Sequence, residues 1–327
     1  MKHDRRQVLR KFLQLAAGAA ALAAAPRLAR AQPYPSHPIR LIVGFPAGNA
    51  PDIIARLMAQ WLSDGLGQQV VIENRPGAAS NIATEAAVNA PPDGYTLLLV
   101  VLTNVINAAL YPNLKFNFVH DLAHVAGVAN SPFVVVVNPD LPAKNIPELI
   151  AYAKANPGKI NMASGGNGAS THIFGELFKL MAGVDLLHVP YRGSYLPDLL
   201  SGQVQIVFNP IPQSMELIRS GKLRALAVTT AKRLAALPDV PTVGEFVAGY
   251  EAIGWFGLSA PKATPADIVE RLNQATNAAL ADPRLVAHLA ELGVEPMPMT
   301  SAGFGKFVAA DYEKWAKVIR TAGIKAD

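Results

Sequence analysis

Short apolar segments alternate with amphipathic segments along most of the chain, and this alternation limits the possible folds more than any other feature of the sequence. In the first amphipathic segment, residues 52–66, apolar residues recur at helical spacing and form a stripe that faces a core. Alternation of this kind predicts sheets of mostly parallel strands flanked by helices. The first series comprises strand 39–45, helix 52–66, strand 70–73, helix 81–89 and strand 95–102.

A second series of the same kind begins at residue 133, so we expect two similar α/β lobes with a cleft between them. We expect the chain to cross between the lobes near Asn130 and Gly254, which gives one lobe of residues 32–130 plus 257–327 and another of residues 131–256. The series comprises strand 133–137, helix 146–156, strand 160–163, helix 170–181, strands 186–189 and 204–208, helix 212–219 and strand 223–229. After a Pro-rich stretch, strand 254–260 leads back into the first lobe with helices 265–281, 283–292 and 301–322.

Residues 1–31 have the pattern of a cleaved export signal. A basic start precedes an Ala-rich apolar run at 12–25, which is too short to cross a bilayer. Small residues then predict cleavage near Ala31 and Gln32. The Arg5–Arg6 pair favours the twin-arginine route, with general secretion as the alternative. The mature protein is therefore expected in the periplasm.

Charge and cysteine content exclude several classes of function. The chain has 29 Lys and Arg against 24 Asp and Glu, and removing the seven basic residues and one acidic residue of the signal leaves 22 against 23. A mature chain with this balance lacks the basic surface that nucleic acid would require, so we expect no nucleic-acid partner. The chain contains no cysteine, which excludes thiol catalysis, thiolate metal sites and disulfides.

Two glycine-containing loops, residues 44–52 and 164–172, each lead from a predicted strand into a predicted helix. Such loops lie at the carboxyl ends of strands, where open α/β sheets bind ligands. The first backbone N–H groups of a helix lack partners within the helix, and together with the helix dipole they favour an anion. Neither loop has a phosphate-binding or dinucleotide-binding motif. With one loop in each lobe, the sequence predicts a shared site for a small anion.

Several long segments carry a specific resemblance that covers essentially all of the mature chain. They include GFPAGNAPDIIARL, VIENRPGAASNIATEAAVNAPPDGYTLLL and ASGGNGASTHIFGELFKLMAGVDLLHVPYRGS. The chain resembles the substrate-binding proteins of tripartite tricarboxylate transporters, the Bug-type receptors. This resemblance implies a two-lobed periplasmic-binding-protein fold of the type II-like kind. It also implies a monomeric receptor, without enzymatic activity or cofactor, that captures a small organic carboxylate by hinge closure and delivers it to the large and small membrane subunits of a transporter.

The resemblance also implies which residues bind the ligand, and it includes no catalytic residue and no metal ligand. The residues are Phe45, Pro46, Ala47, Gly48, Asn49 and Asp52 in the first loop, Thr103 and Asn107 after the strand at 95–102, and Ser164, Gly168, Ser170, His172, Tyr191, Gly193 and Asn209 in the second lobe. Four features depart from the family pattern: Asn49 replaces a second glycine, Ala79-Ser80 replace a glycine pair, Asn209 replaces an aspartate, and the segment at 191–200 is shorter. All four lie near the expected cleft, so they bear on which ligand is bound.

Other functions remain open at this point. Asp52 has a second interpretation as a residue that stabilises the start of a helix. A periplasmic hydrolase or isomerase would use Ser170, His172 or Asp52, but residues two apart at a helix start do not share a face. A chemosensor that is not coupled to transport is a further alternative, which the sequence does not separate from a transport receptor.

Three smaller features each have a functional and a structural interpretation. His120 and His124 have helical spacing and, with Asp121, would suggest a metal site, although polar surface residues are the more common explanation. Arg192 either reaches the anion from the second lobe or has a structural role. Trp255 either forms a wall of the cleft or packs in the core.

Overall fold

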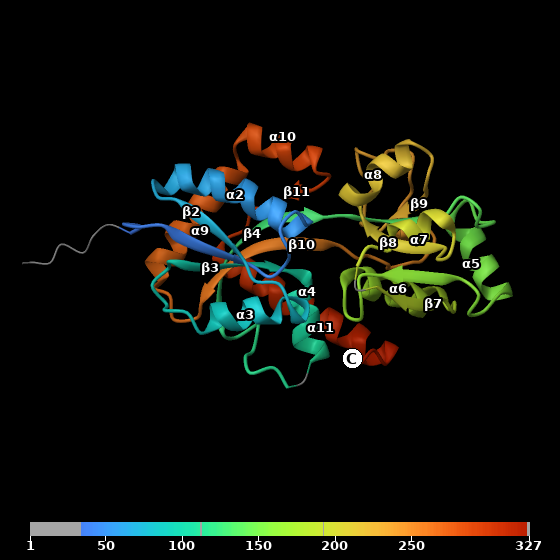
Figure 1. Cartoon of the computed structure of the whole chain (residues 1–327), viewed down its shortest axis with the longest axis horizontal. Helices are drawn as coiled ribbons and strands as arrows, with labels where there is room; N and C mark the ends of the chain where they lie inside the picture. The colour runs from blue at the N-terminus through green and yellow to red at the C-terminus, as the bar shows by residue number, and fades with distance from the viewer. Residues whose placement is uncertain (1–33, 112, 192, 326–327) are drawn as a thin grey trace, which may run out of the picture. The chain divides into compact units, whose positions relative to one another are not determined.

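The strands pair into two mixed sheets in the computed structural model, which describes residues 34–111, 113–191 and 193–325 (Figure 1). The predicted export signal at 1–31 lies outside the described residues. Both sheets belong to one compact unit that starts at His37. The first sheet has the order β11-β4-β10-β3-β1-β2. Its strands are β1 (Ile39–Val43), β2 (Val70–Asn74), β3 (Thr96–Val101), β4 (Leu122–Ser131), β10 (Gly254–Pro261) and β11 (Glu295–Pro296).

The second sheet lies in the part of the chain between β4 and β10 and has the order β7-β6-β8-β5-β9. Its strands are β5 (Phe133–Val137), β6 (Asn161–Ser164), β7 (Leu187–Pro190), β8 (Ile206–Pro210) and β9 (Arg224–Val228). The strands β3, β5 and β10 are buried along their whole length, as the apolar runs of the sequence predict.

The predicted α/β fold class is confirmed, and both sheets are mixed, with antiparallel pairs beside the predicted parallel ones. β1 pairs in parallel with β2 and β3, and β6 pairs in parallel with β7 and β8. β10 is antiparallel to β3 and β4, and β5 is antiparallel to β8 and β9. The antiparallel pairs involve the strands at which the chain passes between the sheets: β4 leaves the first sheet and β10 returns to it, so they run in opposite directions.

Helices flank both sheets. In the first sheet α2 and α9 pack together on one face, while α3, α4 and α11 lie on the other (Figure 1). In the second sheet α6 covers β6 and β8, and α8 packs on β5 and β8. The helices are α2 (Ala50–Leu66), α3 (Asn81–Val88), α4 (Leu102–Leu110), α5 (Ile146–Ala155), α6 (Ser170–Ala182), α7 (Leu196–Ser201), α8 (Ile211–Arg219), α9 (Ala266–Leu280), α10 (Pro283–Glu291) and α11 (Ser301–Ala322), with short 3-10 turns η1 (Ala78–Ser80) and η2 (Val243–Glu245).

The apolar core continues from one sheet to the other. The helix α11 packs against α4 beside the first sheet and against α6 beside the second. Between α6 and α11 the ring of Phe174 stacks on that of Trp315, with ring centroids 5.2 Å apart. The ring of Phe174 also meets that of Phe133 edge-on, with centroids 4.7 Å apart. Within the described residues, no helix combines the length and the apolar composition that a membrane crossing requires.

Two short segments carry the chain between the sheets. Only Pro132 separates the end of β4 from the start of β5, and the return path reaches the first sheet at Gly254. Gly254 pairs with Ser131, so the outgoing and returning segments lie side by side. The predicted crossing points, Asn130 and Gly254, fall in the last residues of β4 and at the first residue of β10.

Candidate functional site

A cavity of about 600 Å³ lies between the two sheets, and the starts of the helices α2, α4, α6 and α8 line it together with the start of the short helix α7. Helices α2 and α4 follow strands of the first sheet, and α6 and α8 follow strands of the second. Its lining comprises Phe45, Asn49, Ala50, Pro51, Val101, Leu102, Thr103, Ser131, Phe133, Gly165, Ala169, Ser170, Thr171, Gly193, Ser194, Tyr195, Leu196, Pro210, Gln213, Gly254, Trp255 and Phe256. The first N–H groups of a helix are not used within the helix, so the starts of α2, α4 and α6 suit a small anion. At the start of α8, the Ile211 N–H already donates to the Pro132 carbonyl at 3.1 Å.

None of the described residues that line the cavity carries a charged side chain. The polar part of the wall consists of hydroxyl and amide groups together with the helix starts. The rings of Phe133, Trp255 and Phe256 supply an apolar part. A buried anion must exchange its hydration for hydrogen bonds, and here neutral donors are the groups that can provide them.

The first loop is held in place by Asp52, which is buried with 2 % of its surface exposed. One carboxylate oxygen accepts hydrogen bonds from Arg56 Nε at 2.9 Å and from the Gly48 N–H at 2.8 Å. The other accepts from Asn74 Nδ2 at 2.8 Å, and Asn74 also donates to the Phe45 carbonyl at 3.0 Å. Arg56 foremost, with the Gly48 and Asn74 donors, lowers the pKa of Asp52 to about 2. Asp52 therefore holds the loop through hydrogen bonds to its backbone and to Asn74, which agrees with the interpretation that Asp52 stabilises the start of the helix.

Gly48 is required by backbone conformation. Its φ is +84°, in the left-handed region that favours glycine. Its N–H points to Asp52 and it is not among the lining residues, in contrast to the expectation that it contacts the ligand. Pro46 and Ala47 are exposed outside the cavity lining, whereas Phe45 and Asn49 line it.

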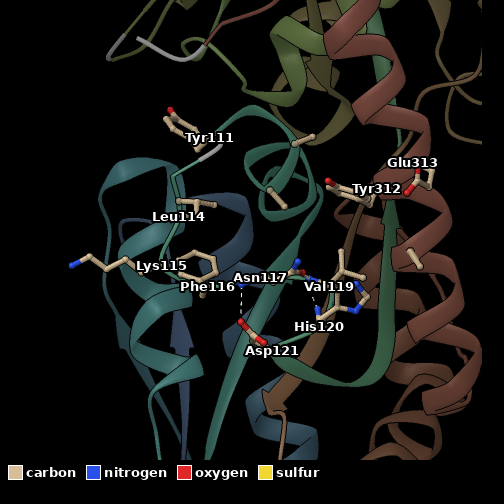
Figure 2. A pocket seen from close by; sticks show the side chains of 13 residues that line it. Tyr111, Leu114, Lys115, Phe116, Asn117, Val119, His120, Asp121, Tyr312 and Glu313 are labelled. Carbon is tan, nitrogen blue, oxygen red and sulfur yellow. Dashed lines mark hydrogen bonds between the residues drawn. The ribbon is translucent and has the colours of Figure 1, made fainter.

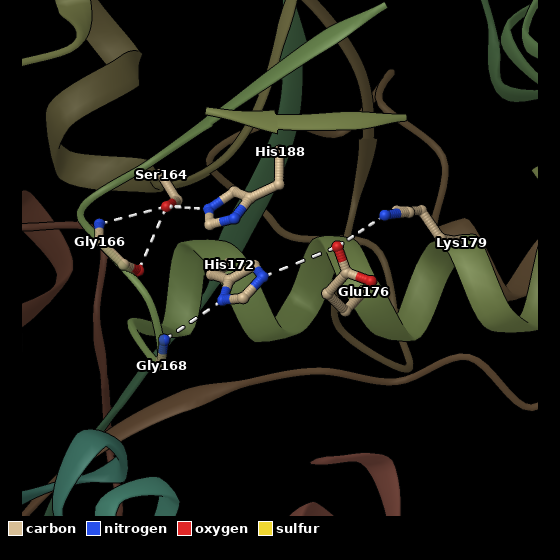
Figure 3. A network of polar contacts seen from close by, with 7 residues as sticks. All are labelled: Ser164, Gly166, Gly168, His172, Glu176, Lys179 and His188. Carbon is tan, nitrogen blue, oxygen red and sulfur yellow. Dashed lines mark hydrogen bonds and ion pairs between the residues drawn. The ribbon is translucent and has the colours of Figure 1, made fainter. Parts of the chain in front are cut away.

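The second loop is held by a network of polar contacts behind the cavity (Figure 3). The buried hydroxyl of Ser164 lies 2.6 Å from His188 Nε2 and accepts the Gly166 N–H at 3.2 Å. His172 Nδ1 accepts the Gly168 N–H at 3.2 Å. Ser164, Gly168 and His172 therefore support the loop, while its Gly165 and the helix start that follows line the cavity.

His172 also stacks on His188, with ring centroids 3.7 Å apart and ring planes 6° from parallel. Its Nε2 lies 3.7 Å from Glu176, which also pairs with Lys179 at 2.8 Å (Figure 3). Both ring nitrogens of His172 are directed at Gly168 and Glu176, and neither contact involves Ser170. The geometry therefore gives no support to a Ser170–His172 catalytic pair.

Asn107 and its neighbour Asn104 fix a strained turn beside the first sheet. Asn104 Nδ2 donates to Ser80 Oγ at 3.2 Å, and Asn107 Nδ2 donates to the Ala79 carbonyl at 2.6 Å. Three consecutive residues of this turn, Ala78, Ala79 and Ser80, have φ values of 45°, 50° and 75°. Asn107 is buried away from the cavity lining, so it supports the turn.

Tyr195, which the sequence analysis did not single out, lines the cavity from the start of α7. Its hydroxyl donates to Asn209 Oδ1 at 2.5 Å, and burial raises its pKa. Asn209 is fully buried behind Tyr195 and does not line the cavity. Tyr191 also lies outside the lining and donates to Asp198 at 2.6 Å, while burial and that carboxylate raise the pKa of Tyr191 to about 12.

Comparison with known proteins agrees with this architecture. The model of the tripartite tricarboxylate transporter family receptor matches residues 54–324. The chain belongs to this receptor family. The receptor is 38% identical to BugT of Bordetella pertussis over 302 residues, which is 90% of this chain and 92% of BugT.

Two solved structures with named ligands are also similar to the receptor. The R. palustris protein Rpa4515 with adipate has a TM-score of 0.82 and 36% identity, covering 89% of this chain and 99% of that one. MatC of Rhodopseudomonas palustris with bound malate has a TM-score of 0.77 and 28% identity, covering 88% and 100%. The receptor thus shares both its fold and its family with solute-binding proteins.

Five of the predicted site residues line the cavity of the receptor: Phe45, Asn49, Thr103, Ser170 and Gly193. The other predicted residues lie behind or beside it. Sequence reasoning missed lining residues such as Ser131, Phe133, Thr171, Tyr195 and Gln213. A strand end or helix start could have indicated several of them, and Tyr195 precedes the short helix α7, which Pro197 and Gly202 mark in the sequence. Trp255 fits both of its interpretations, since its buried ring lines the cavity and its Nε1 donates to Asp311 at 2.7 Å.

A second cavity, of about 770 Å³, lies between the segment after α4 and the helix α11 (Figure 2). Its lining includes aromatic and charged side chains, among them Tyr312, His120 and Lys115, and Lys115 extends away from the others. All its lining residues lie in elements that flank the first sheet, so it does not combine the two halves of the receptor. Despite its larger volume, it is the weaker candidate for a ligand enclosed by both.

The two histidines considered for a metal site differ in burial. His120 is exposed, whereas His124 is buried with its Nδ1 3.0 Å from Ser259 Oγ. Within the described ranges, no three His, Asp or Glu side chains gather in an arrangement that could hold a metal ion. Arg192 lies outside the described residues.

Proposed function

We propose that this receptor binds a small organic carboxylate in the cavity between its two sheets, in the periplasm, and delivers it to the membrane subunits of a tripartite tricarboxylate transporter. The observation that carries the proposal is the convergence on one cavity of helix starts that follow strands of both sheets. Family membership and the related proteins with adipate and malate support the same class of ligand. The signal pattern at 1–31 supports export, with the twin-arginine route as the favoured one.

The cavity suits a compact ligand with a carboxylate and an apolar portion. A volume of about 600 Å³ lies within the range typical of small-molecule sites. The backbone N–H groups at the helix starts can bind the carboxylate, and the side chains of Phe133, Trp255 and Phe256 can pack against the carbon skeleton. Because the donors come from both sheets, a ligand that reaches both stabilises the closed arrangement over an open one.

Ligand-induced stabilisation of the mature protein tests this function. Adipate, malate, citrate and benzoate are compared with adipamide, a neutral molecule of nearly the same size and shape as adipate. A bound acid is expected to raise the free energy of unfolding by about 2.7 kcal/mol at a hundredfold excess over Kd. Adipamide is expected to give no comparable shift, because it brings no charge to the helix starts. Equal stabilisation by the acid and the amide would overturn the proposed anion recognition.

Delivery to a transporter is tested separately from binding. A strain that carries the gene for this receptor and the two membrane subunits is expected to take up the radiolabelled acid that gives the largest melting shift. Deleting the receptor gene should abolish this uptake, and a plasmid copy should restore it. Uptake that persists without the receptor would restrict its function to binding without transport.

A further inference from the structure

A directional chain of hydrogen bonds lies behind the wall formed by Tyr195. The Ser214 hydroxyl donates to the Pro210 carbonyl at 3.3 Å, which uses its single hydrogen. Ser214 Oγ therefore acts as an acceptor for Asn209 Nδ2 at 2.7 Å. This orients the Asn209 amide so that its Oδ1 accepts the Tyr195 hydroxyl at 2.5 Å.

The chain fixes what Tyr195 can offer to a ligand. With its hydrogen committed to Asn209, the hydroxyl of Tyr195 can only accept a further hydrogen bond. Tyr195 lines the cavity, whereas Asn209 and Ser214 are fully buried behind it. The helix starts can donate hydrogen bonds to the ligand, whereas the Tyr195 hydroxyl can only accept one from it.

Charge adds a second restriction. Asn209 is neutral, and no described lining residue carries a negative side chain. An ammonium group of a ligand would therefore lose hydration without meeting an opposite charge on the described wall. A neutral donor, such as a hydroxyl group, loses much less when it is buried against one acceptor.

We propose that Tyr195, oriented by Asn209 and Ser214, determines specificity by accepting a hydrogen bond from a neutral donor of the ligand, so that hydroxylated carboxylates are preferred over both unsubstituted and amino-substituted ones. This inference rests on the proposed carboxylate-binding function. Tyr195 contacts the ligand, and Asn209 and Ser214 are positioning residues that act through it.

Matched ligands measure this preference in the full mature protein. Calorimetry compares succinate with malate and aspartate, and adipate with 3-hydroxyadipate, so that each pair differs by one substituent. The wild-type protein is expected to bind the hydroxylated member of at least one pair about tenfold more tightly than the unsubstituted acid, and malate about tenfold more tightly than aspartate.

The substitution Tyr195→Phe removes the acceptor and keeps the ring. It is expected to weaken binding of the hydroxylated acid about tenfold and to leave the unsubstituted acid within about threefold, so the preference disappears. A merely structural role would weaken both acids equally. Melting curves of the variant confirm that it is folded.

The substitution Asn209→Asp keeps an acceptor for the Tyr195 hydroxyl and adds a negative charge. We expect it to retain the preference for the hydroxyl group, to weaken binding of every dianion, and to raise the affinity for aspartate relative to malate about tenfold. This variant tests whether the substituent of the ligand lies beside Tyr195 and position 209, even if Tyr195→Phe fails to fold.

The outcomes separate the two proposals. If acids bind but the wild type shows no hydroxyl preference, or Tyr195→Phe and Asn209→Asp leave every ratio unchanged, the role of Tyr195 is overturned and the carboxylate site stands. If none of the acids binds, the proposed function itself fails, and the inference fails with it.

Discussion

Ala78, Ala79 and Ser80 are three consecutive non-glycine residues that adopt left-handed backbone conformations. Such a conformation costs an L-residue about 1–2 kcal/mol, so the surrounding contacts must compensate for it. Asn104 and Asn107 provide two of these contacts. The turn also approaches Gly44 so closely that a Cβ atom there would overlap Ser80. The replacement of a family glycine pair by Ala79-Ser80, noted from the sequence, thus has a structural cost in this chain.

Ala79→Gly is expected to increase the free energy of unfolding by about 0.5 kcal/mol, because relief of the left-handed conformation exceeds the added chain entropy. Chemical denaturation measures the change. Ala151→Gly, at an exposed position within α5, is the matched control and should lose about 1 kcal/mol. Equal losses in both variants would show that the turn stores no strain.

His124 gives the protein a specific sensitivity to acid. Burial lowers its pKa from 6.5 to about 4, with a smaller contribution from His120. Between these values the unfolded chain binds a proton that the folded protein does not bind, so stability falls as the pH falls through this window. The shift corresponds to about 3 kcal/mol by pH 4. His124→Gln should lose that much less stability between pH 7 and pH 4 in denaturation experiments, and parallel pH profiles of the two proteins would contradict the assignment.

For single residues, the sequence indicates the chemical role of a side chain better than its location relative to the cavity. A role of Asp52 at a helix start is one of the two interpretations that the sequence offers, because acidic residues favour that location. The sequence could not show that Ser164 and His172 would lie behind the second loop, since that depends on their contacts with His188, which follows on β7.

Among the elements, most strands and helices were predictable, and the exceptions have a physical cause. Residues 96–110 form one apolar run that contains both β3 and α4, with no glycine or proline between them. Periodicity does not mark the boundary, and its one local capping contact, from the Val101 N–H to Asn104 Oδ1, lies inside the run. The sequence therefore predicts a loop at Thr103, which lies in the first turn of α4. The strand β4 was missed because it includes Gly127 and several polar residues.

The start of α2 depends on the inner contacts of Asp52. Asp52→Asn removes the charge and places an N–H₂ group against the donors of Gly48 or Asn74, so the loop that carries Phe45 and Asn49 loses its anchor. We expect ligand affinity to fall about tenfold by calorimetry.

Arg56→Gln is the control for this prediction. Arg56 approaches Asp52 from the exposed side, so this substitution leaves the hydrogen bonds of Asp52 with Gly48 and Asn74 in place. It should change affinity by less than about threefold, because water can take the place of the exposed guanidinium while the inner hydrogen bonds of Asp52 hold the loop. If both variants bind equally weakly, the charge pair, and not the anchoring of the loop, controls the site.

For the whole molecule, the pattern of the sequence was sufficient for the fold class but not for the sheet directions. The two α/β series predicted two sheets and a site between them, and family membership supports this organisation. The antiparallel pairing of β10 with both β3 and β4 arises from long-range contacts that local periodicity does not encode. The α11 contacts that link both sheets into one core are of the same kind.

Under the proposed closure of the two halves around a ligand, the crossing segments act as the hinge, and Gly254 is a tightly packed point of them. A Cβ atom at Gly254 would lie 2.9 Å from the Phe133 ring and 3.1 Å from the Ser131 carbonyl. Both neighbours line the cavity, so Gly254→Ala must displace them or separate the crossing segments. We expect ligand affinity to fall about tenfold and stability by about 1–2 kcal/mol.

Small-angle scattering distinguishes an effect on closure from a local effect of Gly254→Ala. Ligand should reduce the radius of gyration of the wild-type protein, and the reduction should be smaller in the variant at saturating ligand. The control Gly65→Ala adds a methyl group to open space on the exposed face of α2 and should stabilise the protein by about 1 kcal/mol without altering affinity or contraction. Full contraction and unchanged affinity in Gly254→Ala would show that the crossing segments do not control closure, because the added atom would then be accommodated without moving either half.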